Sequence, residues 1–309
     1  MTEKPSPPAR AGGAGGKAEA AVPEPRLIDV LHLDRERVIG AWIVDDEILV
    51  DPGPAAAVAE LLRRIGNWRP RAIALTHVHL DHAGATGALL RRWPGTEVWV
   101  HETGARHLAD PARLLAGARQ IYGDELERLW GETLPVPAEA IRPLRDGDTA
   151  GPFEVLHTPG HAPHHVTFVD RGRGWAFPGD VGGIRIAPCT YVLPPTVPPR
   201  TDLEAWERSL ARIAERRPTA LAPTHFGLHT DVEIHLESTR AALRRLAEEA
   251  RRRSREGFVG WLEGELAALG YPCSPEAYRQ IGRLGMLWDG LQGALAGRAG
   301  QGRGAGPSG

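Results

Sequence analysis

Apolar and polar positions along the chain follow two periods, and their alternation predicts an α/β fold. Short apolar runs predict strands at about 27–31, 38–44, 48–51, 71–75, 97–101, 153–156, 165–169, 174–177 and 219–222. Helical spacing predicts helices at about 54–65, at 81–92 and, with interruptions at Pro111 and Gly123, over 103–131. Another helix is expected from Thr201, where Thr201 and Glu204 have the spacing of a capping box. Helices alternating with strands in both halves are expected to cover the faces of sheets.

The C-terminal third has a different pattern. It predicts helices at about 231–254, 257–269 and 275–294. Residues 1–25 and 297–309 carry too few apolar side chains to offset the entropy of ordering, so both ends are predicted to be flexible tails. The expected organisation is therefore a main domain over 26–230 and a helical C-terminal region over 231–296.

Composition excludes several classes of protein. The chain has 309 residues, 42% of them hydrophobic, and a formal net charge of −2, so nucleic acid is not an expected partner. No apolar run is long enough for a membrane span, and the N-terminus lacks the apolar core of a secretory signal. The two cysteines, Cys189 and Cys273, cannot build a disulfide framework. A cytoplasmic protein is expected.

The densest chemistry lies directly after the predicted strand at 71–75. There, His77, His79, Asp81 and His82 fall within six residues. Residues two apart on an extended backbone point the same way, so His77 and His79 are predicted to hold one metal ion. Asp81 and His82 then face a second position, although Asp81 also has the place of a helix-capping carboxylate. Imidazole and carboxylate donors suit zinc, iron or manganese.

Three later strands end in the same way. Each runs into a turn containing proline or glycine, and the first functional side chain past the turn is His161, Asp180 or His225. Loops at the ends of strands in a rigid sheet commonly carry chemistry, and these residue types match the needs of a metal site. We therefore expect the three side chains to join the histidine motif.

In this order and at this spacing, the four motifs resemble the metallo-β-lactamase superfamily. They are His77-x-His79-x-Asp81-His82, Thr158-Pro159-Gly160-His161, Pro178-Gly179-Asp180 and Thr224-His225. The resemblance covers about residues 26–230 and implies a four-layer αββα sandwich, to which this chain adds a helical C-terminal extension. It also implies that His77, His79 and His161 hold one metal, that Asp81, His82 and His225 hold a second, and that Asp180 bridges them. The pair of Asp81 and Asp180 is similar to the glyoxalase-II-like hydrolases rather than to the antibiotic-degrading β-lactamases.

These donors imply hydrolytic chemistry. Two divalent ions, zinc first and iron or manganese as alternatives, would favour a bridging hydroxide at neutral pH, and Asp81 and Asp180 are the expected catalytic residues. The expected substrate is a small molecule, an ester, thioester or lactone. Asp51, at the end of its strand, matches a carboxylate that the family uses to support the site. Tyr191 and His165 are candidate substrate-binding residues, and whether His164 or His165 contributes to the site stays open.

Three other functions compete with this hypothesis. Persulfide dioxygenases of the same superfamily keep the same ligand pattern but use one iron, held by the equivalents of His77, His161 and Asp180, and activate oxygen instead of water; the ligands alone do not distinguish them. Processing nucleases share the histidine motif, but the near-neutral charge makes a nuclease the weaker alternative. A non-catalytic interaction protein on the same scaffold would be expected to lose ligands, whereas this chain keeps all seven.

Overall fold

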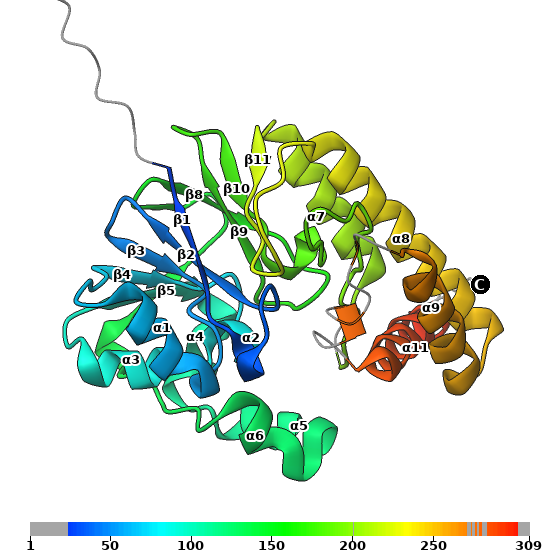
Figure 1. The fold of residues 1–309 in the computed structure, drawn as a ribbon, viewed down its shortest axis with the longest axis horizontal. Coiled ribbons are helices and arrows are strands. Elements are labelled where there is room, and N and C mark those ends of the chain that lie inside the picture. Colours follow the sequence, from blue (N-terminus) through cyan, green and yellow to red (C-terminus); the bar gives the residue numbers. More distant parts are fainter. Residues whose placement is uncertain are drawn as a thin grey trace, which may run out of the picture.

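The computed structural model describes residues 24–199, 201–270, 273, 276, 278, 279 and 283–301. Two sheets form its centre (Figure 1). The first has the order β1-β2-β3-β4-β5-β6, with β1 (Arg26–Asp29), β2 (Gly40–Val44), β3 (Ile48–Val50), β4 (Ala72–Ala74), β5 (Glu97–His101) and β6 (Ile141–Leu144). The second has the order β11-β10-β9-β8-β7, with β7 (Thr149–Ala150), β8 (Phe153–His157), β9 (Val166–Asp170), β10 (Trp175–Phe177) and β11 (Ala220–Leu221).

Helices cover the outer face of each sheet. The first half of the chain contributes α1 (Val58–Ile65), α2 (Leu80–Ala83), α3 (Thr86–Arg92), α4 (Glu102–Ala109), α5 (Ala112–Tyr122) and α6 (Leu126–Trp130). The second half contributes α7 (Leu203–Glu215), α8 (Val232–Arg252), α9 (Arg255–Ala268) and α11 (Leu284–Gln301). Short 3₁₀ turns lie at His32–Asp34, Ala55–Ala57, Gly123–Glu125, Ala138–Ala140 and Gly179–Gly182. No helix within the described residues is both long and apolar enough to cross a membrane.

The period of two in the strands explains why the layers stack. In β2, Ala41 and Ile43 pack against the α1 and α3 side, whereas Trp42 and Val44 pack between the two sheets. In the second sheet, Phe168 faces the first sheet and Val169 faces the cluster formed with α7, α8 and α9. The layers thus follow the order helices, sheet, sheet and helices, and one apolar cluster lies between each pair of neighbouring layers. The predicted four-layer αββα sandwich with a helical C-terminal extension is confirmed.

Some predicted details are wrong. The helix expected over 81–92 is divided into α2 and α3, because Gly53 N–H donates to the His82 carbonyl and Ala85 N–H donates to the Gly53 carbonyl. These bonds to the loop after β3 use backbone groups of the helix junction. The N-cap of α7 is Asp202, which accepts from the Glu204 and Ala205 amides, while the Thr201 hydroxyl donates to the Val197 carbonyl.

The chain ends also differ in part from the prediction. Helix α11 continues to Gln301, past the boundary expected at 297. Most of the predicted N-terminal tail, residues 1–23, lies outside the described residues, as do residues 302–309. Much of the early part of the helix expected over 275–294 also lies outside them. The division at 230 and 231 stays a prediction.

Candidate metal centre

The structure brings all seven predicted ligands into two adjoining groups. His77, His79, His161 and Asp180 form the first set, and Asp81, His82, Asp180 and His225 form the second. Within each set, one donor atom per residue lies within 4.8 Å of all the others. Asp180 belongs to both sets: its Oδ2 lies 3.3 Å from His161 Nε2, and its Oδ1 lies 3.1 Å from His82 Nε2.

Both sheets supply donors to each set. The first four ligands come from the segment after β4, with Asp81 and His82 in the short helix α2. His161 follows β8, Asp180 lies in the 3₁₀ turn after β10, and His225 follows β11. All these segments meet at one edge of the sandwich, which is why residues up to 148 positions apart, His77 and His225, share a site.

Two glycines let the loops reach this edge. Gly179, with a φ of +47°, precedes Asp180, and a Cβ there would lie 2.6 Å from His165 Nε2 and 2.7 Å from Thr76 Oγ1. Gly160 precedes His161, and a Cβ there would lie 2.4 Å from the Trp206 Cα. Any other residue at these positions would push the following ligand away from the centre.

The donor atoms fit a metal. Buried polar atoms normally have hydrogen-bond partners, yet the Nε2 atoms of His77, His82 and His225 and Oδ1 of Asp180 have none. The opposite ring nitrogens are held: His161 Nδ1 lies 2.8 Å from the Pro195 carbonyl and His225 Nδ1 lies 2.6 Å from the Val38 carbonyl. Donation from Nδ1–H to these carbonyls leaves the Nε2 lone pair facing the centre, as ligation requires.

Asp51 supports the site from beneath, in agreement with the prediction. Its fully buried carboxylate accepts from the Thr76 amide at 2.8 Å, the Thr76 hydroxyl at 2.7 Å and the Thr224 hydroxyl at 2.8 Å. It also lies 2.8 Å from His82 Nδ1. One carboxylate therefore joins the segments that carry His77, His82 and His225.

Charge in the centre also suits cations. Burial opposes ionisation of Asp180, but the neighbouring His82 and His161 imidazoles hold the pKa of its carboxyl well below the usual range. Burial lowers the pKa of His77 and brings that of His79 to about 3, so these rings keep a free lone pair. Burial also disfavours charge on His82, but Asp180, Asp81 and Asp51 raise its pKa above the usual value. A metal in the second set would therefore displace a proton from His82.

A cavity of about 760 Å³ opens beside the first set and is lined in part by His79, Asp81, His161 and Asp180. Its other walls come from α4, α5, the Pro195–Pro199 segment and Met286 of α11. His77, His82 and His225 are buried and do not line it. This volume is typical of small-molecule sites, and substrate would approach from the side of His79 and Asp81.

The family model of the metallo-beta-lactamase superfamily matches residues 38–225. The chain belongs to this superfamily. A hydroxyacylglutathione hydrolase from Xanthomonas euvesicatoria is 31% identical over 239 residues, which cover 73% of this chain and 75% of the relative. A superfamily protein from Sulfolobus tokodaii has the same fold, with a TM-score of 0.65 at 19% identity over 87% of this chain and 98% of the other. A metallo-beta-lactamase family protein from Thermus thermophilus has a TM-score of 0.60 at 24% identity, and the match covers 85% of this chain and 89% of the other. Superfamily and relatives support a metal-dependent hydrolase.

Neither of the two expected substrate-binding residues, His165 and Tyr191, lines the cavity beside the donor sets. His165 is fully buried beneath the centre, 3.0 Å from the Thr158 hydroxyl, and does not line the cavity. Tyr191 packs edge-on against Tyr278 in the cluster with the C-terminal helices, also away from the cavity. His164 is the histidine that lines the cavity, with its ring 5.9 Å from that of His79.

Sequence reasoning also missed a link between the superfamily domain and the C-terminal region. Cys189 and Cys273 form a disulfide, with Cα atoms 4.9 Å apart across a separation of 84 residues. Cys189 lies in the loop that leads to the Pro195–Pro199 wall of the cavity. No spacing rule for a single distant pair could have predicted this bond.

Proposed function

We propose that this chain is a dinuclear metal-dependent hydrolase of ester, thioester or lactone bonds. The observation that carries the proposal is the pair of complete donor sets that share Asp180, with its two oxygens facing different sets. A single-iron dioxygenase that kept the same ligand pattern would hold its iron within the first set, so metal content and oxygen uptake separate the two functions. Zinc is the metal we propose first. The same imidazole and carboxylate donors also accept iron or manganese.

His77, His79 and His161 would hold one ion, Asp81, His82 and His225 the other, and Asp180 would contact both. When bound, such ions supply a hydroxide nucleophile at neutral pH and polarise the attacked carbonyl. Asp81 lies at the border of the cavity, where its second oxygen can accept a hydrogen bond from the attacking group and orient it. Asp51 and the backbone carbonyls hold the imidazoles still, so little reorganisation is needed during the reaction.

Two further observations support an acyl substrate. Several curated relatives carry the name hydroxyacylglutathione hydrolase, and one of them matches nearly three quarters of this chain. The cavity wall is largely apolar, which suits an organic acyl compound better than a polynucleotide.

The test combines metal analysis with turnover. Elemental mass spectrometry on protein purified without added metal should give about two ions per chain, and a panel of thioesters, lactones, esters and phosphodiesters should show acyl hydrolysis. Asp180→Asn should lower kcat/KM at least about a hundredfold, whereas Asp124→Asn, an exposed carboxylate outside the cavity, should leave it unchanged. One iron per chain with thiol-dependent oxygen uptake and no hydrolysis would overturn the proposal in favour of the dioxygenase.

A further inference from the structure

The cavity beside the metal centre has an uneven distribution of charge. Apart from Asp81 and Asp180, the only formally charged side chains among its described lining residues are Arg106 at the end of α4 and Arg113 at the start of α5. Both carboxylates belong to the donor sets, where metal would neutralise them. The remaining fixed charge on the wall is therefore positive.

Arg106 and Arg113 line the same cavity from the two sides of the turn between α4 and α5. Arg106 Nε donates to His107 Nε2 at 3.4 Å, and neither guanidinium has a carboxylate partner among the described residues. Burial, followed by the charges of Arg106 and Arg113, lowers the pKa of His107. The field of both guanidiniums thus reaches His107, which stays neutral and adds no charge of its own.

A continuous wall of side chains leads from the metal centre to this point. The His79 and His164 rings have centroids 5.9 Å apart, and the His164 and His107 rings have centroids 6.3 Å apart. Arg106 adjoins His107. Two side chains, His164 and His107, therefore stand between the donor sets and Arg106, which favours a substrate longer than a short acid.

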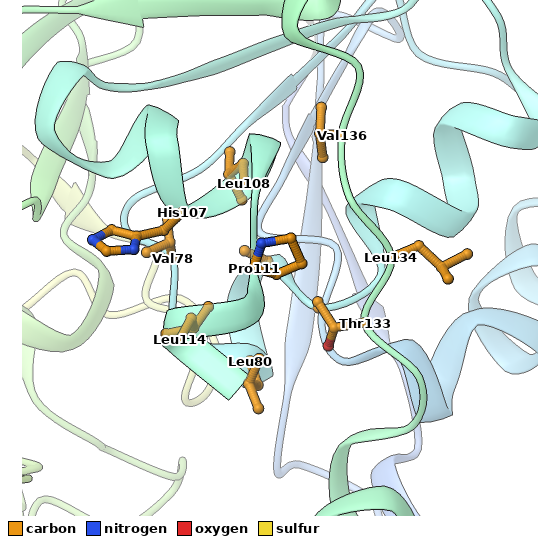
Figure 2. Close-up of a pocket in the computed structure, with 11 residues that line it drawn as sticks. Val78, Leu80, His107, Leu108, Pro111, Leu114, Thr133, Leu134 and Val136 are labelled. Carbon is orange, nitrogen blue, oxygen red and sulfur yellow. The ribbon is translucent and has the colours of Figure 1, made fainter. Parts of the chain in front are cut away.

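Apolar side chains lie behind the corner that carries the arginines, where α4 ends and α5 begins. Leu108 is buried there and lines a small cavity of about 10 Å³ together with Val78, Pro111 and Val136 (Figure 2). His107 and Leu114 line this small cavity and also the large one. The two cavities therefore share this corner.

We propose that the substrate is an elongated acyl compound with an anionic end group, a carboxylate or a phosphate, which Arg106 and Arg113 bind while its carbonyl lies at the donor sets. This inference rests on the proposed hydrolase. The apolar side chains of Leu114, Ile121 and Met286 line the cavity and would contact the body of such a substrate. Planar guanidiniums are suited to both anions because they donate paired hydrogen bonds.

The test compares matched substrates on the metal-loaded, full-length enzyme. Phenyl monoesters of α,ω-dicarboxylic acids of increasing chain length are compared with the same esters whose distal carboxylate is a neutral primary amide, and with distal phosphates. Wild type should prefer the anionic esters by about tenfold in kcat/KM, mainly through KM, as expected for two exposed charge contacts. The preference should grow with chain length and weaken as salt is added. The relative rates of carboxylate and phosphate esters identify the anion.

The double variant Arg106→Gln, Arg113→Gln should lose this preference while keeping its rate on the neutral esters. Arg119→Gln is the matched control, because Arg119 also lies on α5 but pairs with Glu127 at 3.7 Å and does not line the cavity. Equal rates for charged and neutral esters in wild type, or a preference that survives the double change, would overturn the inference and leave the hydrolase intact. If no acyl compound is hydrolysed, the proposed function fails, and calorimetry with unreactive amide analogues still decides whether the arginines bind the anion.

Discussion

Asp51 is fully buried and lines neither of the two cavities described above, so replacing it tests whether a residue beneath the metal centre controls that centre. Asp51→Asn is nearly isosteric, and asparagine accepts the φ of +46° at this position as readily as aspartate does. The change therefore alters hydrogen bonding and charge more than shape. What it removes is the ability to accept on both oxygens.

The structure gives the size of the effect. Asp51 Oδ1 accepts from the Thr76 amide, while Oδ2 accepts from the Thr76 and Thr224 hydroxyls and lies beside His82 Nδ1. If the amide oxygen of the introduced asparagine takes the place of Oδ2, its NH₂ group takes the place of Oδ1 and faces the Thr76 N–H. Neither of these two donors then has an acceptor. Losing one hydrogen bond to a buried charged group costs about 1.5–3 kcal/mol, and weakening the other three brings the total to about 3 kcal/mol.

Metal affinity should change together with stability. Asp51→Asn should weaken metal binding about tenfold, and Asp51→Ala, which releases the His82 ring, about a hundredfold. The unfolding free energy of the metal-free protein is measured by urea denaturation, and affinity by competition with a chromogenic chelator. Asp46→Asn is the control, because the exposed Asp46 carboxylate pairs with exposed Arg26, and it should change stability by less than about 0.5 kcal/mol. Wild-type affinity in both Asp51 variants would refute the supporting role.

Three other outcomes follow from the same structure. A chelator should lower Tm and added zinc should restore it, since an ion at a hundred times its Kd stabilises the folded state by about 2.7 kcal/mol; calorimetry showing one Tm with and without metal would contradict the site. Burial lowers the pKa of fully buried His235 to about 4, so as the pH falls this side chain takes up a proton in the unfolded chain before it does so in the folded protein. Stability should therefore fall by up to about 3 kcal/mol as pH drops from about 6.5 to 4, and urea denaturation should show a smaller fall for His235→Gln. Cys273→Ser should lower the unfolding free energy by about 2–4 kcal/mol without reductant, and equal stability with wild type would count against the disulfide.

The sequence could predict the layers because the alternation in the strands is a local signal. Trp42 and Ile43 are neighbours in the chain, and the pleat alone assigns them to opposite sides of the first sheet. Strand β6 was missed because Arg142 and Pro143 interrupt its apolar run, and β7 because it has only two residues. The N-cap at Asp202 depends on which side chain reaches the free amides, which spacing does not fix.

The candidate centre was predictable to the extent that its residues form compact motifs. The choice between His164 and His165 was not, because it depends on which of two adjacent side chains points to the cavity after folding. Arg106 and Arg113 belong to no recognisable sequence motif, so the sequence could not single them out. Their proposed role depends only on their lining the same cavity after folding. The cytoplasmic location and the absence of nucleic-acid or membrane partners stay predictions.

Each donor set takes side chains from both halves of the chain, and this has a consequence for biosynthesis. Each set takes two side chains from the segment after β4 and two from loops of the second sheet, which the ribosome makes later. A nascent chain that has folded only its first half presents an incomplete coordination sphere, and so does an isolated second half. Tight metal capture must therefore wait until the two halves have docked, which protects the emerging chain from retaining a wrong ion. Metal uptake during refolding would then report the joining of the halves rather than the formation of either one.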